Sequence, residues 1–212
     1  LNELKATEVF ATLGIEPPGS VVVASAEEVG DVAGPTAVKL LSPDILHKTD
    51  AGMVRLNVSG CDAIRATVAE LLAGARDRFP TARVDGVLIA PMHKGLQEVI
   101  LGYREDAEVG PIVMLGIGGV MAELKRSYSV RLAPVSEQEA LTMIAELPEL
   151  KLIQGFRGLP KGDVAALARA IRSISLVARL KDRPVQEAEI NPLIIRPEGE
   201  GVVAVDGLLT LR

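Results

Sequence analysis

The sequence is poor in the residues from which several common kinds of site are built. It has one cysteine, Cys61, which excludes an internal disulfide and a cysteine metal cluster. Its two histidines, His47 and His93, argue against a multi-histidine metal site. Two tyrosines, three phenylalanines, no tryptophan and a net charge of −5 argue against a nucleic-acid partner. The chemistry left to the chain is that of carboxylates, amides, lysines and glycines, which suits magnesium and phosphate.

Long apolar runs are also missing. The longest, from Ile112 to Ala122, has 11 residues and includes three glycines, whereas a helix that crosses a bilayer needs about 20 apolar residues. We therefore expect no membrane partner and, with a single cysteine, a cytoplasmic protein. The chain lacks an initiator methionine, which fits a processed piece or one segment of a longer protein.

Hydrophobic periodicity predicts an α+β chain of 212 residues. Helices are expected over 2–13, from residue 25, and over 62–79, 136–147 and 163–180; strands are expected over 20–24, 36–41, 53–58, 84–92, 97–104, 110–116, 130–133, 185–195 and 202–211. A seam near 91–95 divides an N-terminal α/β lobe, residues 1–92, from a C-terminal lobe, residues 93–212. Ligands commonly bind between two such lobes.

The segment 38–54 joins two predicted strands through a polar loop. Lys39 lies within an otherwise apolar strand, and a buried lysine needs a partner such as an anionic ligand. The loop adds His47 and Lys48 and ends at Gly52, and a neutral imidazole can act as a nucleophile or a base. The alternative is a solvated hairpin loop with a snorkelling lysine and a surface histidine.

Two further segments carry groups suited to a nucleotide. At Ala90, Pro91 and Met92 a strand ends, so its backbone groups could meet an adenine edge, and Glu98 could accept two ribose hydroxyls. The alternative is a plain loop with an exposed glutamate. The sequence GIGG at 116–119 is not followed by a helix of the dinucleotide-binding kind and remains a candidate nest for phosphate or for a neighbouring chain.

A predicted hairpin near the C-terminus gathers oxygen ligands. Glu189 and Asn191 are two residues apart on a strand and so face the same side. If residue 195 pairs with residue 202, Asn191 lies opposite Asp206. Magnesium takes a few protein oxygens and leaves its other positions to substrate phosphates. A register slip of one residue would turn Asp206 away, and the alternative is an edge hairpin with a polar outer face.

Taken together, these segments resemble the ATP-grasp domain of NDP-forming acyl-CoA synthetases, the family of ADP-forming acetyl-CoA synthetase and the succinyl-CoA synthetase beta subunit. The resemblance spans nearly the whole chain. It is carried by KLLSPDILHKTDAG at 39–52, EVILG at 98–102, GPIVMLGIGG at 110–119, RLAP at 131–134, GFRG at 155–158, EINPL at 189–193 and Asp206. It implies an ATP-grasp fold with two lobes and the nucleotide cleft between them.

The resemblance also implies roles for single residues. Lys39 would hold ATP phosphates, Ala90–Met92 would meet adenine, and Glu98 would bind the ribose. Asn191 and Asp206 would bind Mg²⁺, with Glu189 beside them. His47, next to Lys48, would carry a phosphoryl group to the nucleotide site, so that phosphate moves between a phosphohistidine and ADP/ATP. The chain would then be the phosphoryl-transfer part of an acid–CoA ligase (ADP-forming). It would need CoA-binding and CoA-ligase domains, on the same or a companion chain, to handle the carboxylic acid and acyl-CoA.

One position departs from the family pattern. Relatives usually have two glycines before the strand, whereas this chain has Gly52 followed by Met53. A side chain there would lie where the backbone approaches phosphate, which leaves a second interpretation open. In that alternative the chain is a catalytically impaired, regulatory synthetase-like domain of a larger protein such as an acetyltransferase. A third interpretation is a scaffold domain that binds partner chains without nucleotide.

Overall fold

The structure is a computed structural model, and it describes residues 1–45, 48–119, 127–155 and 158–212. The helices are α1 (Glu3–Thr12), α2 (Cys61–Arg78), α4 (Glu137–Ala145) and α5 (Val164–Ser175), with 3₁₀ turns at Ala26–Glu28, Pro148–Lys151 and Leu176–Arg179. The strands are β1 (Val21–Val23), β2 (Thr36–Leu41), β3 (Val54–Val58), β4 (Gly86–Pro91), β5 (Gln97–Asp106), β6 (Gly110–Ile117), β7 (Tyr128–Leu132), β8 (Val185–Ile195), β9 (Val202–Ala204) and β10 (Gly207–Leu211).

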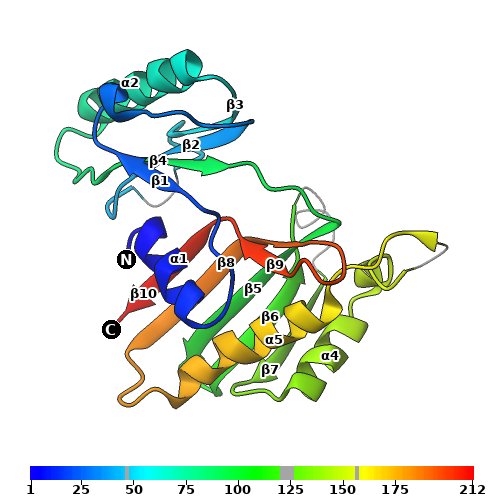
Figure 1. Cartoon of the computed structure of the whole chain (residues 1–212). Coiled ribbons are helices and arrows are strands. Elements are labelled where there is room, and N and C mark those ends of the chain that lie inside the picture. The colour runs from blue at the N-terminus through cyan, green and yellow to red at the C-terminus, as the bar shows by residue number, and fades with distance from the viewer. Residues whose placement is uncertain (46–47, 120–126, 156–157) are drawn as a thin grey trace. The chain divides into compact units, whose positions relative to one another are not determined.

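The chain divides into two compact units. The smaller comprises residues 2 and 18–92, and the larger comprises residues 1, 3–17 and 93–212. In the smaller unit the strand order is β1-β4-β2-β3, and helix α2 covers one face of this antiparallel sheet (Figure 1). The core between them contains Val38, Leu40, Met53, Ile64, Val68 and Leu71. Burial of these side chains is what holds α2 on the sheet.

The larger unit is built on a sheet with the strand order β10-β8-β5-β6-β7, to which β9 adds by pairing with β8. Helices α4 and α5 cover one face of this sheet (Figure 1). Val99, Leu101 and Tyr103 of β5 point into that helix-covered core. Because strand side chains alternate, the residues between them belong to the opposite face.

Helix α1 groups with the larger unit, whereas the sequence predicts it in the N-terminal lobe. Its Phe10 is fully buried, and a β-carbon at Gly207 of β10 would lie only 2.6 Å from the Phe10 ring. The carbonyl of Glu16 accepts a hydrogen bond of 2.9 Å from the N–H of Ala204. The start of the chain is therefore attached to β9 and β10, far from it in sequence, which residue patterns alone do not reveal.

The helix predicted from Ser25 is wrong. The structure has a single 3₁₀ turn there, and the Ser25 side chain makes no capping hydrogen bond. The Glu28 carboxylate instead accepts a hydrogen bond of 2.7 Å from the N–H of Ala24. Val29 is already extended, and glycines follow at 30 and 34 with a proline at 35, so the segment has too few helix-forming residues to continue.

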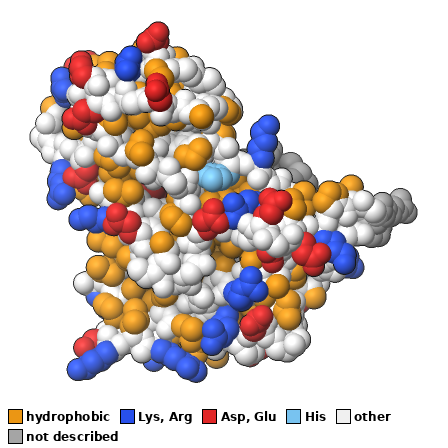
Figure 2. Space-filling view, in the orientation of Figure 1, with side chains coloured by type: hydrophobic (Ala, Val, Ile, Leu, Met, Phe, Trp, Pro, Cys, Tyr) orange, Lys and Arg blue, Asp and Glu red, His pale blue; other side chains and the backbone are white. Residues whose placement is uncertain are grey.

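Two observations concern the surface. None of the helices in the described residues is both long and apolar enough to span a membrane. On the face shown in Figure 2, acidic and basic side chains are interspersed among apolar ones. The net charge of −5 is therefore not gathered into one patch on this face.

Candidate nucleotide and phosphoryl-transfer residues

The predicted register of the C-terminal hairpin is confirmed. Ile195 pairs with Val202 and Leu193 with Ala204, and the same register continues to the pair of Ile190 with Gly207. Between these pairs, the N–H of Asn191 donates to the carbonyl of Asp206 over 3.1 Å. Asn191 and Asp206 are thus direct cross-strand neighbours.

Two of the residues predicted to bind a metal are in side-chain contact, and the third lies opposite them on the neighbouring strand segment. The Asn191 side-chain amide donates to the Glu189 carboxylate, with 3.3 Å between Nδ2 and Oε1. One Asp206 carboxylate oxygen accepts the N–H of Gly207 at 2.8 Å, which orients that side chain. In the described part of the chain no three His, Cys, Asp or Glu residues form a metal-binding group. Two carboxylates and one amide fit a magnesium ion that keeps phosphate oxygens among its ligands, and they do not fit an all-protein cage.

Strand β8 has a β-bulge at this site that the sequence analysis missed. Val99 of β5 pairs with Leu193, while Leu101 pairs with Ile190. Two residues, Asn191 and Pro192, therefore lie opposite one residue of β5. Bulges occur next to functional sites because they redirect a side chain. Pro192 inside an apolar strand was a signal for it, since proline within sheets is confined to edges and bulges.

Glu98 lies on the same sheet face as Glu189. It is exposed and precedes Val99, whose side chain is buried among the helices on the other face. Both Glu98 and Glu189 thus belong to the face that α4 and α5 leave uncovered. The carboxylate expected to bind a ribose and the residues expected to bind a metal are therefore brought to one side of one sheet.

The glycines at 118 and 119 pack against Glu98, a relationship that sequence reasoning did not find. The N–H of Gly118 donates to the Glu98 carbonyl at 2.9 Å. Gly119 has a φ of +70°, and a β-carbon there would lie 2.9 Å from the Glu98 carboxylate. The glycine-rich sequence at 116–119 was the available signal, and its role here is to leave room for this glutamate.

The segment expected to meet adenine consists of the last two residues of β4 and Met92, which follows the strand. Ala90 pairs with Ala37 and Pro91 with Thr36 of β2, while the ladder with β1 ends at Ile89. The N–H of Met92 donates to the carbonyl of Pro35 at 2.9 Å. A base edge would therefore be read by other backbone groups of 90–92 and not by this N–H.

Lys39 and Lys48 both belong to the smaller unit. Lys39 is 5% exposed and lies between Val54 of β3 and Leu88 of β4. Its neighbours Val38 and Leu40 belong to the core under α2, so strand alternation assigns Lys39 to the other face. Lys48 is half-buried, and its carbonyl accepts the N–H of Met53 at 2.7 Å. His47 lies outside the described residues.

The side chain of Met53 belongs to the core and not to the surface of the turn. Its side chain is fully buried in the core of the smaller unit. A positive φ is found at Gly52, at +64°, but not at Met53. The turn therefore needs glycine only at position 52, and methionine at 53 fills the core beneath it.

These features fit what comparison with known proteins finds. A family model described as "ATP-grasp domain" matches residues 1–211. The chain belongs to the ATP-grasp family. It is 34% identical over 215 residues to the beta subunit of acetate–CoA ligase (ADP-forming) II of Pyrococcus furiosus, with 99% of this chain and 91% of that subunit covered. The expected fold is thereby confirmed.

Other relatives place the same domain within longer chains. The 4-hydroxybutyrate–CoA ligase (ADP-forming) of Nitrosopumilus maritimus is 33% identical, and the match covers 97% of this chain but only 30% of that ligase. This ATP-grasp domain thus matches nearly all of a separate beta subunit and less than a third of a fused ligase. The named relatives are ADP-forming acyl-CoA ligases, of which it covers only the ATP-grasp part.

Solved structures agree. An acetyl-coenzyme A synthetase of Ca. Korarchaeum cryptofilum, in complex with coenzyme A and Ca-AMPCP, matches with a TM-score of 0.88 and 32% identity, over 100% of this chain and 93% of that one. Another structure of that enzyme contains Mg-AMPPCP, and its phosphohistidine segment points towards the nucleotide binding site. The likeness supports the synthetase interpretation of this ATP-grasp domain and not the regulatory alternative.

Proposed function

We propose that this ATP-grasp domain binds ATP or ADP with Mg²⁺ and transfers a phosphoryl group between the nucleotide and His47, as the nucleotide part of an ADP-forming acyl-CoA ligase. The observation that carries the proposal is the register of β8 with β9 and β10, which brings Asn191 and Asp206 together on the sheet that also carries Glu98. Relatives with nucleotide analogues and a phosphohistidine segment support the reaction class.

Each residue has a role that its chemistry allows. Glu98 would accept hydrogen bonds from ribose hydroxyls, and Ala90–Met92 would contact the base. Lys39 would supply positive charge to the phosphates. Glu189, Asn191 and Asp206 would hold Mg²⁺, which supplies charge neutralisation at the phosphate oxygens when bound. Transfer then depends on positioning and charge more than on covalent work by other side chains.

His47 is the nucleophile of the proposed transfer step. An imidazole nitrogen forms a bond to the γ-phosphorus of ATP as the bond from that phosphorus to the bridging oxygen of ADP breaks, and ADP leaves. In the reverse direction the β-phosphate oxygen of ADP takes the phosphoryl group from the histidine. Lys48, the next residue, would add positive charge where the phosphoryl group moves.

Calorimetry with ATP and ADP tests the binding half of the proposal. We expect binding that requires Mg²⁺ and is lost in EDTA, because the ligands include substrate oxygens. Affinity unchanged by EDTA would rule out the metal assignment. Absence of any nucleotide binding would favour the scaffold interpretation.

Labelling tests the transfer half. Incubation with ATP labelled at the γ-phosphate should give a protein label that is stable to base and labile to acid, as an N–P bond requires. The label should disappear in His47→Ala and persist in His93→Ala, the matched control at the other histidine. Full labelling of His47→Ala would show that His47 is not the acceptor.

A further inference from the structure

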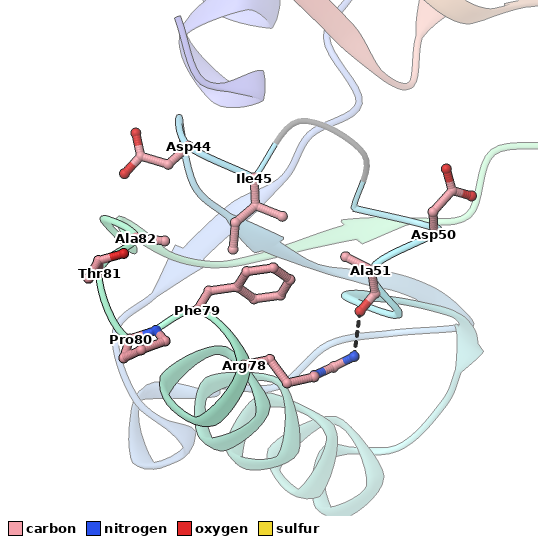
Figure 3. A pocket seen from close by; sticks show the side chains of 9 residues that line it. All are labelled: Asp44, Ile45, Asp50, Ala51, Arg78, Phe79, Pro80, Thr81 and Ala82. Carbon is pink, nitrogen blue, oxygen red and sulfur yellow. Dashed lines mark hydrogen bonds between the residues drawn. The ribbon is translucent and has the colours of Figure 1, made fainter.

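Two arginines hold the backbone where the polar loop at 42–53 returns to strand β3. Arg78, the last residue of α2, donates to the carbonyl of Ala51 over 2.7 Å (Figure 3). Its other terminal nitrogen lies 3.8 Å from the sulfur of Met53. The side chain thus reaches from the end of a helix to two residues of the loop's last turn.

Arg55, the second residue of β3, also donates hydrogen bonds to the backbone of this turn. One of its nitrogens donates to the carbonyl of Gly52 at 2.9 Å and to the carbonyl of Val54 at 3.0 Å. Its other terminal nitrogen forms an ion pair with Glu70 of α2. The carbonyls of residues 51, 52 and 54 are therefore all bound by guanidinium groups, and hydrogen bonds with a charged donor are the stronger kind.

The bound turn reaches back to Lys48. The N–H of Gly52 donates to the carbonyl of Thr49 at 2.9 Å, and that of Met53 donates to the carbonyl of Lys48 at 2.7 Å. Gly52, at a φ of +64°, lets the chain close this turn. Fixing the carbonyls on one side of the turn therefore fixes the backbone of Lys48 on the other.

Packing between the turn and the end of α2 leaves an open space. A cavity of about 740 Å³ lies between the loop and the end of the helix (Figure 3). It is lined by Asp44, Ile45, Asp50, Ala51 and residues 78–82. Ala51 also packs on the core beneath α2, and the hydrogen bond from Arg78 adds a polar contact to it at the edge of this open space.

Helix α2 also makes room for Arg78. A β-carbon at Gly74, one turn earlier, would lie 3.3 Å from a terminal nitrogen of Arg78 and 3.8 Å from the terminal carbon of Met53. A larger residue at 74 would crowd both side chains. Gly74, Met53 and Arg78 therefore form one packed group beneath the turn.

We propose that Arg78 is a positioning residue for phosphoryl transfer, which acts by holding the turn at Ala51–Met53 and, through it, Lys48. The inference rests on the function proposed above and deepens it. Arg78 need not touch the nucleotide, so its loss should slow transfer without weakening nucleotide binding. A small misplacement of a reacting group can lower a rate about a hundredfold.

The test compares Arg78→Met with Arg78→Lys and with Arg76→Met. Methionine keeps much of the stem but removes the donors, whereas lysine keeps one charged donor. Arg76 lies in the same last turn of α2 and shows no hydrogen bond or ion pair to the described part of the loop, which makes it the matched control. Far-UV circular dichroism and melting temperature establish that each variant folds.

Three measurements are made on each variant. They are amide hydrogen exchange at Gly52 and Met53, calorimetric affinity for Mg-ATP, and the initial rate of His47 labelling. In Arg78→Met we expect exchange at these two amides to rise about tenfold while amides of the β2–β4 ladder are unchanged. We also expect labelling to fall about ten- to a hundredfold with affinity within twofold. Arg78→Lys should lie between Arg78→Met and the wild type in both exchange rate and labelling rate. Arg76→Met should match the wild type in both.

Two results would overturn the inference. Exchange at Gly52 and Met53 that does not change in Arg78→Met shows that Arg78 does not hold the turn, whatever the function. Faster exchange with a labelling rate equal to that of Arg76→Met shows that holding the turn does not matter for transfer. A wild-type chain that binds nucleotide but never takes label instead refutes the proposed transfer itself, and the exchange rates still report the turn separately.

Discussion

The backbone N–H of Asn191 donates a hydrogen bond to the carbonyl of Asp206, with 3.1 Å between nitrogen and oxygen. This bond lies between the pairs Leu193–Ala204 and Ile190–Gly207. Each side has two residues between these pairs, so the pairing register is the same before and after Asn191 and Asp206. The relative positions of two proposed magnesium ligands are therefore set by the sheet and not by a flexible loop. Removing one ligand should change metal binding without disturbing the strands.

Asp206→Asn tests this separation. Asparagine can still accept the N–H of Gly207 through its side-chain oxygen, but it removes one negative charge. We expect the affinity for Mg-ADP to fall at least about tenfold, since carboxylate oxygens are the preferred ligands, with little change in melting temperature. Glu187→Gln, on the same strand and two residues before Glu189, is the control for loss of charge alone. An equal loss of affinity in both variants would contradict the assignment.

Gly119→Ala tests the contact between the glycine pair and Glu98. The new β-carbon would lie 2.9 Å from the Glu98 carboxylate, so that carboxylate must move. Gly110→Ala is a matched control, because Gly110 also has a positive φ, +84°, but nothing lies within 4 Å of a β-carbon there. Both variants should lose about 1–2 kcal/mol of unfolding free energy. Only Gly119→Ala should lower the calorimetric affinity for nucleotide; a comparable drop in Gly110→Ala would show a general effect.

Met53→Gly separates packing from catalysis. The Met53 side chain is fully buried, and removing a side chain of this size costs about 2–5 kcal/mol of unfolding free energy. In the complete assembly, the rate of His47 phosphorylation should nevertheless change by less than about tenfold, or 1.4 kcal/mol in barrier. Denaturant unfolding and labelling measure the two effects, with Met53→Leu as the volume-conserving control. A gain of several hundredfold would revive the regulatory interpretation.

Asp163 should make stability depend on acid pH. Burial raises the pKa of Asp163, but hydrogen bonds from the N–H groups of Ala166, Gly201 and Gly199 lower it further, below its usual 3.8. Because the pKa in the folded state is the lower one, the stabilisation is complete above the unfolded-state pKa and is lost as pH falls through the folded one.

The measurement is urea unfolding from pH 7 to pH 2.5. In Asp163→Asn the side-chain nitrogen cannot accept the N–H groups of Gly199 and Gly201. The variant should therefore lose about 1–3 kcal/mol at pH 7, and the difference from the wild type should shrink below pH 4. Exposed Asp77 supplies the control, since Asp77→Asn should change unfolding free energy little at any pH. A difference for Asp163→Asn that is constant with pH would refute the charge argument.

The division of labour among domains is also testable. The chain covers only the ATP-grasp part of its fused relatives, so alone it should make no acyl-CoA from ATP, CoA and a carboxylic acid. Adding CoA-binding and CoA-ligase domains should restore ATP-dependent synthesis of acyl-CoA. The assay measures the amount of thioester formed. Turnover by the chain alone would show that it contains more of the reaction than we propose.

Local patterns predicted much of this molecule because its elements follow simple rules. Alternation in β8 and the turn at 196–201 sufficed to place Asn191 opposite Asp206. Arg131 of β7 pairs with Glu146 at the end of α4, a partner that local sequence patterns do not identify. The attachment of α1 to β10 and the reach of Arg78 to Ala51 could not be predicted. Both depend on contacts between residues that are distant in the chain. Hydrophobic periodicity predicts which face of an element is buried, but it does not predict which distant residue a long side chain contacts.

The bulge at Asn191–Pro192 constrains how the gene can change length. Between matched pairs at the bulge, β8 has two residues where β5 has one. On its other side, β8 and the chain from β9 to β10 have the same number of residues between matched pairs. Losing one codon between 190 and 193 would abolish the bulge and also break the pairing with 204–207. The pairing of β8 with β9 and β10 could be kept only if a second residue were deleted between 204 and 207. Insertions and deletions at these two separate places in the sequence should therefore occur together among relatives or not at all.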